Sequence, residues 1–313
     1  FDEEPVERIR SQLLVGLARD AEDPDHIAGR VLRRLLFGNH PYSREVSGTP
    51  ESIAKIAVAD LRSFVAERFG RDNLLVGVVG DITPAELAPL LDDTFGGLPE
   101  NSAPHDLPEA DVSTEGAVVV IEKPIPQSIA VLGQPGIMRD DPDYYTAYVA
   151  NHIFGGGGFT SRLYQKVREE RGLAYSVYSY LSPLDYGAVL GAGVATQNAR
   201  IGESIELIRD EWARFAAEGP TEKELDDAKT HLTGAFPLRL SSTGAISSLL
   251  VGMQLEELGI DYIDRRNDFI EAVTLEDARR VAGSLFQPDA LSIVVVGQPE
   301  GVTATRPPPE GAS

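Results

Sequence analysis

The chain has 313 residues, of which 42% are hydrophobic and 25% are charged, and its formal net charge at pH 7 is -21. This composition is typical of a globular protein of about two domains, and no apolar run is long enough to span a membrane. The negative charge argues against nucleic acid as a partner, because phosphate contacts require clustered lysine and arginine side chains. The chain has no cysteine, which excludes disulfides, a thiolate nucleophile and cysteine metal ligands.

The first hundred residues are predicted to be mainly helical. Helices are expected near Pro5–Asp20, Pro24–Phe37, Val58–Phe69 and Pro84–Phe95, and one strand at Leu74–Val79. The first residue is phenylalanine rather than methionine, and the opening helix is charged and lacks an apolar signal core. We therefore expect that any targeting segment has been removed. The compartment stays open, with the bacterial periplasm slightly favoured over the cytoplasm.

The second part of the chain follows a linker over Pro99–Gly116 that contains proline, asparagine and aspartate. Mostly β-branched or small apolar residues predict strands at Ala117–Glu122, Ser128–Leu132, Ala174–Ser182, Ala188–Ala195 and Leu291–Val296. Helices are expected over Asp141–Phe154 with Asp141 as the cap, over Ile201–Ala217, and over Thr221–Leu240 with a capping box of Thr221 and Glu224. Strands grouped around helices favour an α+β sandwich, in which a mostly antiparallel sheet carries a helical layer.

An internal repeat indicates how the chain is organised. Residues Val58–Gly80 and Leu275–Gly297 share the same internal spacing of a capped helix, a turn and a buried strand, at an offset of 217 residues between Asp60 and Asp277. A weaker similarity joins Glu7–Gly16 with Asp226–Ala235. The repeat predicts two copies of one two-layer α/β domain, of which the first copy is incomplete.

The repeat also predicts domain boundaries. Residues 1–98 are expected to form the later half of the first copy, 99–116 the linker and 117–302 the complete second copy. The tail over 303–313 contains three successive prolines and is predicted to be disordered. By this offset, about a hundred residues of the first copy are expected upstream of Phe1.

Familiar hydrolytic motifs are missing from the sequence. Its five histidines are never three to five residues apart, which excludes a zinc pair of the H-x-x-E-H or H-E-x-x-H kind within these 313 residues; they are His26, His40, His105, His152 and His231. There is no G-x-S-x-G elbow, and the glycine run lacks the Lys-Ser/Thr of a phosphate loop. We interpret His40 as part of a turn and His152 as a helix-packing or capping residue rather than a ligand contact.

The segment Gly155–Tyr175 is the best candidate for a binding site. Gly155, Gly156, Gly157 and Gly158 leave backbone groups that a ligand main chain can approach, and Thr160 or Ser161 can cap the helix that follows. Arg168 and Tyr175 are candidates to converge on one ligand group. The structural alternative is a mobile glycine loop, a solvated charge at Arg168 beside two glutamates, and an ordinary strand tyrosine.

Several stretches resemble the pitrilysin-type metallopeptidases, the family that includes insulysin, the mitochondrial processing peptidase and paired bacterial homologues. They are Phe37–Tyr42 followed by Gly48–Glu51, then Asn73–Asp81, and above all Ser161–Tyr164 followed by Arg168–Tyr175 (REERGLAY). The whole chain resembles the later three-quarters of such a protein. The resemblance implies that Arg168 and Tyr175 are the pair that binds the substrate main chain near the scissile bond, opposite the zinc.

The same resemblance implies that zinc is not bound by this chain. Two of the family's zinc ligands fall upstream of Phe1, and Gly16 stands at the position expected for the third, where glycine offers no side-chain ligand. Nearby acidic residues are misplaced, because Glu3, Glu4 and Glu7 come too early and Glu22 follows the helix. We therefore expect a peptide-binding subunit without zinc hydrolysis of its own, which completes the active site of a zinc-bearing homologous subunit or of a second copy of itself.

Three other interpretations remain open at this stage. The chain can be a fragment of an active zinc metalloendopeptidase whose H-x-x-E-H lies upstream of Phe1. It can be a structural subunit like the core subunits of the respiratory bc1 complex, although retention of Arg168 and Tyr175 argues against this. It can also be a plain oligomerisation module, whose mark is a large exposed apolar face.

Overall fold

The structure is a computed structural model that describes residues 1–104, 106–309 and 311. His105 and three residues of the tail, 310, 312 and 313, lie outside the described residues. Two compact units are present. Unit 1 comprises Phe1–Leu17, Ser47–Asp106 and Thr233–Asn267, and unit 2 comprises Ala18–Val46, Leu107–Leu232 and Asp268–Ser313. Each unit combines segments from both sides of the boundaries at residues 98 and 117 that the repeat suggests.

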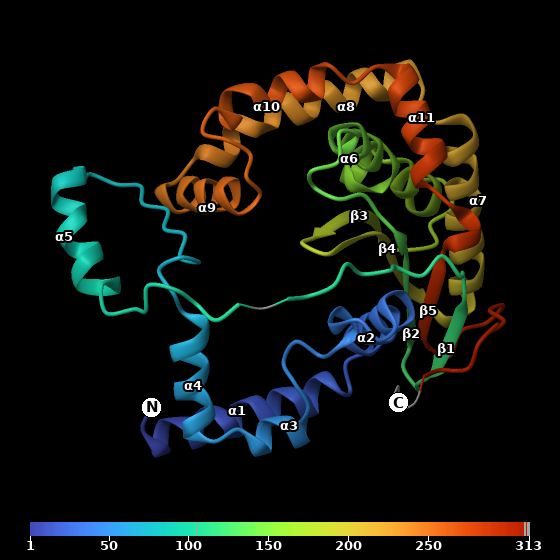
Figure 1. The fold of residues 1–313 in the computed structure, drawn as a ribbon. Helices are drawn as coiled ribbons and strands as arrows, with labels where there is room; N and C mark the ends of the chain where they lie inside the picture. The colour runs from blue at the N-terminus through green and yellow to red at the C-terminus, as the bar shows by residue number, and fades with distance from the viewer. Residues whose placement is uncertain (105, 310, 312–313) are drawn as a thin grey trace. The chain divides into compact units, whose positions relative to one another are not determined.

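Unit 2 is built on a five-stranded mixed sheet (Figure 1). Its strands are β1 (Val118–Glu122), β2 (Gln127–Pro135), β3 (Ser176–Leu184), β4 (Gly187–Gln197) and β5 (Ser292–Gly297), in the order β1-β5-β2-β4-β3. The β1 and β5 pair is parallel, and the other three pairs are antiparallel. All five strands predicted for this part of the chain are confirmed, as is the α+β class.

One face of the sheet packs against α6 (Tyr144–Asn151), α7 (Ile201–Glu218) and α11 (Leu275–Leu285). Aromatic side chains fill this core: the ring of Phe154 lies 5.1 Å from that of Trp212 and 4.8 Å from that of Phe286. Trp212 is fully buried, and its indole N–H donates to Oε1 of Gln134 on β2 at 2.9 Å. The buried polar group is thus satisfied inside the apolar layer.

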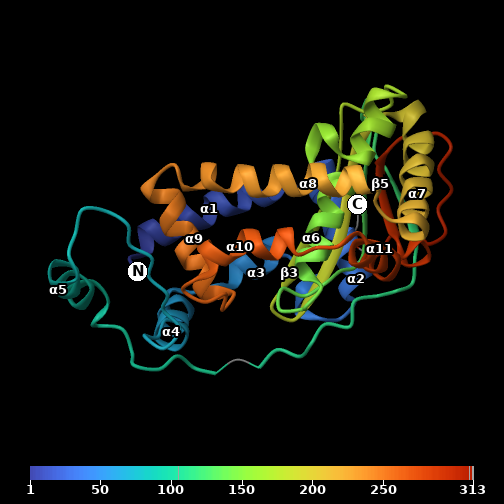
Figure 2. The same cartoon turned by 90° about the horizontal axis from the view of Figure 1, so that it is seen from above.

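The opposite face of the sheet is covered by α2 (Pro24–Phe37), so helices lie on both sides of the sheet and the two-layer prediction is incomplete for this unit (Figure 2). Val31 and Leu32 of α2 pack with Val119 and Val294. A Cβ at Gly133 on β2 would lie 2.9 Å from a methyl group of Leu36. Glycine is therefore needed there for α2 to approach the sheet closely.

Unit 1 is helical in its described residues. It contains α1 (Glu3–Asp20) up to Leu17, α3 (Pro50–Lys55), α4 (Val58–Arg68), α5 (Pro84–Phe95) and α9 (Thr243–Leu255), with the end of α8 (Glu222–Ala235) and the start of α10 (Tyr262–Glu271). The helices predicted near Pro5–Asp20, Val58–Phe69 and Pro84–Phe95 are confirmed. None of α1, α4 and α5 has a buried residue.

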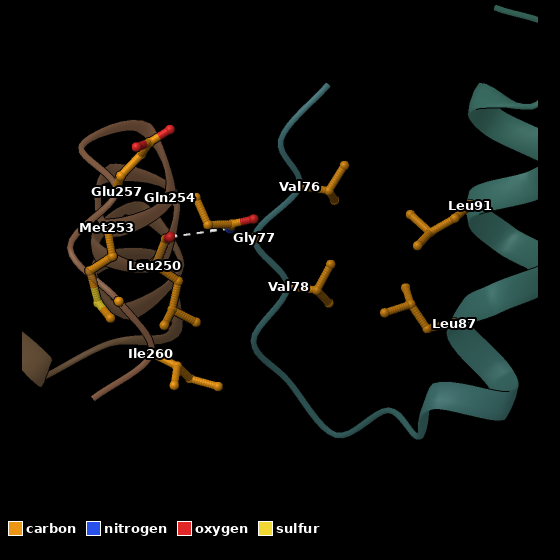
Figure 3. A pocket seen from close by; sticks show the side chains of 11 residues that line it. Val76, Gly77, Val78, Leu87, Leu91, Leu250, Met253, Gln254, Glu257 and Ile260 are labelled. Carbon is orange, nitrogen blue, oxygen red and sulfur yellow. Dashed lines mark hydrogen bonds between the residues drawn. The ribbon is translucent and has the colours of Figure 1, made fainter. Parts of the chain in front are cut away.

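The strand predicted at Leu74–Val79 is wrong, because this segment is part of no strand or sheet. A strand needs a neighbour to satisfy its backbone N–H and C=O groups, and the described part of unit 1 contains no strand. Instead, Val76 and Val78 face α5 across a pocket of about 720 Å³, with Leu250 of α9 on the other side (Figure 3).

Two predicted helices of the second part have different ends. The helix expected from Asp141 begins at Tyr144, because Asp141 accepts from the backbone N–H of Asp143 in the preceding turn and does not cap the helix. At its other end the helix is followed by a π-helical turn over His152–Gly156. The helix expected over Thr221–Leu240 ends at Ala235. Its capping box is confirmed, since Thr221 and Glu224 exchange backbone-to-side-chain hydrogen bonds of 2.8 and 3.3 Å.

Part of the tail is bonded to the sheet. In the tail, where the sequence predicts disorder, the hydroxyl of Thr305 accepts from the backbone N–H of Val118 at 2.8 Å, so this part of the tail is bonded to β1.

No helix within the described ranges is both long and apolar enough to cross a membrane.

Candidate functional site

The glycine run is held against the sheet. A Cβ at Gly155 would lie 2.5 Å from the hydroxyl oxygen of Ser179 on β3, so this buried glycine is required by packing. Gly156 and Gly158 are exposed, and Gly158 has a φ of +60°, which favours glycine. The hydroxyls of Ser161 and Thr160 donate back to the carbonyls of Gly158 and Gly157 respectively. Ser161 has an extended backbone and stands just before the helical turns, where its carbonyl accepts from the N–H of Gln165.

Arg168 and Tyr175 are brought together. Arg168 lies on a π-helical turn over Tyr164–Glu169, and Tyr175 immediately precedes β3. The guanidinium carbon of Arg168 lies 4.9 Å from the centre of the Tyr175 ring and 4.6 Å from that of Tyr164. Two cation–π contacts thus hold the guanidinium between aromatic rings.

Tyr164 and Phe159 complete this aromatic cluster. The ring of Phe159 meets that of Tyr164 edge-on at 4.9 Å and lies 5.8 Å from the Arg168 guanidinium. Tyr164 is only 7% exposed, whereas Phe159 is 71% and Tyr175 84% exposed. Neither Tyr164 nor Phe159 was predicted as a site residue, although the i, i+4 spacing of Tyr164 and Arg168 on a helix is a signal for their contact.

The polar groups of the pair are available to a ligand. Within the described ranges, the Arg168 guanidinium donates no hydrogen bond, and its nearest carboxylate oxygen is that of Glu169, 4.0 Å from Nε. The hydroxyl of Tyr175 also has no hydrogen-bond partner in the part of the chain that is described. The geometry therefore presents unoccupied N–H and O–H donors side by side.

These donors open onto a pocket of about 520 Å³. Besides Arg168 and Tyr175, its polar lining residues are Gln127, Glu169, Ser176, Thr196, Gln197 and Arg200. The four glycines are not among its lining residues. Sequence reasoning did not find Gln127, Gln197 or Arg200, because they come from the ends of β2 and β4 and from the turn after β4, and only strand pairing brings them together.

The remaining motif residues have structural roles. Arg162 donates to both carboxylate oxygens of Glu224, at 2.5 and 2.7 Å, and its guanidinium lies 4.9 Å from the ring of Phe215. Burial opposes ionisation of Glu224, but hydrogen bonds from Arg162 and Thr221 outweigh it, so the pKa of Glu224 is lowered. Arg162 therefore ties the segment to α8 rather than facing a ligand.

The histidines also act in packing. His40 stands before a 3-10 turn over Pro41–Ser43, as the turn prediction requires, and its Nε2 lies 2.9 Å from the carbonyl oxygen of Pro108. His152 stacks on His231, with ring centres 5.1 Å apart, which agrees with the packing interpretation. Burial, aided by the neighbouring His231 ring, lowers the pKa of His152 to about 4.

The described residues do not form a zinc-binding site. In residues 1–104, 106–309 and 311, no group of three or more histidine, aspartate or glutamate side chains is placed to hold a metal. Gly16, at the position expected for the third ligand, lies inside α1, and apart from its chain neighbours and the backbone of its own helix no described atom lies within 4 Å of where its Cβ would be. A zinc site needs three protein ligands, which the described residues do not bring together.

The fold is an α+β domain in which a five-stranded mixed sheet has helices on both faces. Residues 55–232 match the family model described as the peptidase M16 inactive domain. The chain belongs to the M16 peptidase family, as the sequence resemblance indicated.

Similar proteins agree with this assignment. The chain is 30% identical to an uncharacterised zinc protease of Streptomyces coelicolor, over 90% of this chain and 62% of the relative. It is also 30% identical to a non-peptidase homologue of Helicobacter pylori, over 88% of this chain and 66% of the relative. A crystal structure of a peptidase M16 inactive domain from Pseudomonas fluorescens superposes with a TM-score of 0.88 at 31% identity, covering 98% of this chain and 73% of that one. The chain thus spans less than two thirds of the length of these two curated relatives.

Proposed function

We propose that this chain is a peptide-binding subunit that lends Arg168 and Tyr175 to an active site whose zinc is held by a partner chain. The partner is a zinc-bearing homologous subunit or a second copy of this chain. The observation that carries the proposal is the pair itself: a guanidinium held between aromatic rings beside an exposed phenol, with its N–H donors unoccupied by described residues.

The chemistry of the pair suits a peptide bond that is being attacked. A guanidinium can donate to a peptide carbonyl in a fixed orientation, and a tyrosine hydroxyl can donate to the oxyanion that develops on that carbonyl. Tyr164 limits the movement of Arg168, because its buried ring lies 4.6 Å from the guanidinium. The chain itself contributes orientation and charge stabilisation, while the hydrolytic group belongs to the partner.

The glycine run has a supporting role in this proposal. Gly155 fixes the loop on β3, while the exposed Gly156 and Gly158 leave backbone groups for the peptide main chain. Gly157 completes the substrate-contacting run. A side chain at Gly156 would approach the amide nitrogen of Asn151 to 2.8 Å, so the loop has little space for larger residues.

We further infer that residues 1–98 are the later half of a first domain similar to the one at 117–302. The supporting observations are the repeat at an offset of 217 residues and the exposed, unpaired apolar segment Leu74–Val79. The chain spans 62% of the Streptomyces coelicolor relative, and the remaining length of that relative leaves room for the other half of the first domain. In this view the pocket of Figure 3 is filled by strands of the same polypeptide upstream of Phe1.

Reconstitution tests the proposed function. The purified chain is mixed with a zinc-bearing homologue from the same genome, and cleavage of an unfolded protein substrate is followed. The mixture should cleave faster than the homologue alone, and Arg168→Ala or Tyr175→Phe in this chain should remove the gain. Arg171→Ala is the matched control, because that arginine is 57% exposed, pairs with Glu203 and does not line the pocket. Equal cleavage with and without this chain would contradict the proposal.

A second candidate is an active peptidase of which this chain is a part. It is favoured by the similarity to the Streptomyces coelicolor relative, which is named a zinc protease and of which the chain covers 62%. Sequencing the complete gene decides between the two candidates. An H-x-x-E-H motif upstream, together with stoichiometric zinc in the intact product, would support the active enzyme.

A further inference from the structure

We propose that the pocket beside Arg168 and Tyr175 is a carboxylate-binding subsite, which takes either an acidic side chain or the C-terminal carboxylate of a bound peptide. This inference rests on the proposed peptide-binding function and specifies which peptides the site prefers. It concerns Gln127, Gln197 and Arg200, which line the pocket together with the arginine–tyrosine pair.

The first support is the chemistry of the lining residues. Gln127 and Gln197 stand opposite each other at the paired ends of β2 and β4, and both are exposed. Their side-chain amides make no hydrogen bond to any residue that the structure describes. With the Arg168 guanidinium and the Tyr175 hydroxyl, four groups able to donate hydrogen bonds and lacking a partner line one pocket.

The second support is the placement of Arg200. Its Nη1 donates to the carbonyl oxygen of Gly172 at 2.7 Å, which fixes the side chain at the pocket wall. A guanidinium has five N–H donors in a planar fork, so one such bond leaves donors for a ligand. A carboxylate matches that fork geometrically and can accept from two of its N–H groups.

The third support is the local charge. The whole chain carries a net charge of -21, yet this pocket is lined by two arginines and one carboxylate, that of Glu169. The Glu169 side chain is 54% exposed and 4.0 Å from Arg168, so solvent screens its effect on the pocket. The charge of the lining residues is therefore opposite in sign to the net charge of the whole chain, which favours an anionic group over a neutral one at this position.

The test uses three pools of nonapeptides randomised over uncharged residues and the full chain immobilised on a resin. One pool has amidated C-termini, one has free C-terminal carboxylates, and one is amidated but carries a single glutamate. We expect either or both of the last two pools to be retained about tenfold more than the neutral pool, as charge-assisted hydrogen bonds require. The pool that shows the gain identifies the source of the carboxylate.

Variants separate this subsite from the proposed function. Arg200→Gln should abolish the gain without changing retention of the neutral pool, and Arg200→Lys, which keeps the charge, should preserve part of it. Arg171→Gln makes the same charge change outside the pocket and should leave the gain intact; loss of the gain there would contradict the subsite.

Equal retention of all three pools overturns the subsite but leaves peptide binding standing. If wild type retains no pool better than an Arg168→Ala, Tyr175→Phe double variant, peptide binding at this site is wrong as well.

Discussion

Two segments of this protein have nearly the same sequence pattern and different structures. Ser292–Gly297 forms β5 between two other strands, and every residue in it is buried. Leu75–Gly80, at the equivalent place in the repeat, is part of no strand, and Val78 is 40% exposed. The difference shows that an apolar run becomes a strand only where neighbouring strands take its hydrogen bonds and helices cover its side chains.

The largest expected effect comes from placing a charge at the equivalent positions Val295 and Val78. Val295 is fully buried, so Val295→Asp should destabilise unit 2 by about 4 kcal/mol or more, because an unpaired carboxylate enters the core. Val78→Asp should change the free energy of unfolding by no more than about 0.5 kcal/mol. Calorimetric unfolding, which registers both units, measures both changes. Equal losses would show that the two segments are packed alike.

A second pair of equivalent residues is Phe286 and Phe69, which are 1% and 50% exposed. Phe286→Ala removes a ring that contacts Phe154, Trp212 and Phe215, and we expect a loss of about 3 to 5 kcal/mol. Phe69→Ala should cost less than about 1 kcal/mol. Calorimetric unfolding of both variants provides the comparison, and a large loss at Phe69 would mean that unit 1 has a core of its own.

Acid should weaken unit 2 through His152. The pKa of His152 is about 4 in the folded chain against 6.5 for an ordinary histidine, because burial and His231 disfavour its charge. The unfolded chain therefore binds the proton first as the pH falls, and stability is lost between pH 6.5 and 4. Allowing for solvent at the partly exposed ring, we expect a loss of about 1 to 2 kcal/mol. The difference between wild type and His152→Asn across this pH window measures it, and an unchanged difference would contradict the assignment.

The smallest effect concerns helix caps at equivalent positions. Thr274 caps α11 by accepting from the backbone N–H of Asp277 at 3.1 Å, whereas Ala57 before α4 has no side-chain acceptor. Thr274→Ala should cost about 1 kcal/mol in the Trp212 unfolding transition. The converse change, Ala57→Thr, should leave that transition unmoved, and a shift would show that unit 1 contributes to the stability that Trp212 reports.

The sequence predicts most of unit 2 and less of unit 1. Four of the five strands follow from β-branched or small apolar runs, the third being the exception, and the meeting of Arg168 and Tyr175 follows from their spacing around a helix and a strand start. The unpaired state of Leu74–Val79 does not follow, because pairing depends on which other strands are present. Gln127, Gln197 and Arg200 were missed because strand register, rather than any local motif, places them at one pocket.

The most direct test of the central claim is kcat/KM of the mixed complex with Tyr175→Phe or Arg168→Ala in this chain, with assembly followed by analytical ultracentrifugation. If the pair acts on the bound peptide, either variant should assemble normally while kcat/KM falls about tenfold or more. Unchanged kcat/KM in a fully assembled complex would show that Arg168 and Tyr175 do not contribute to peptide hydrolysis.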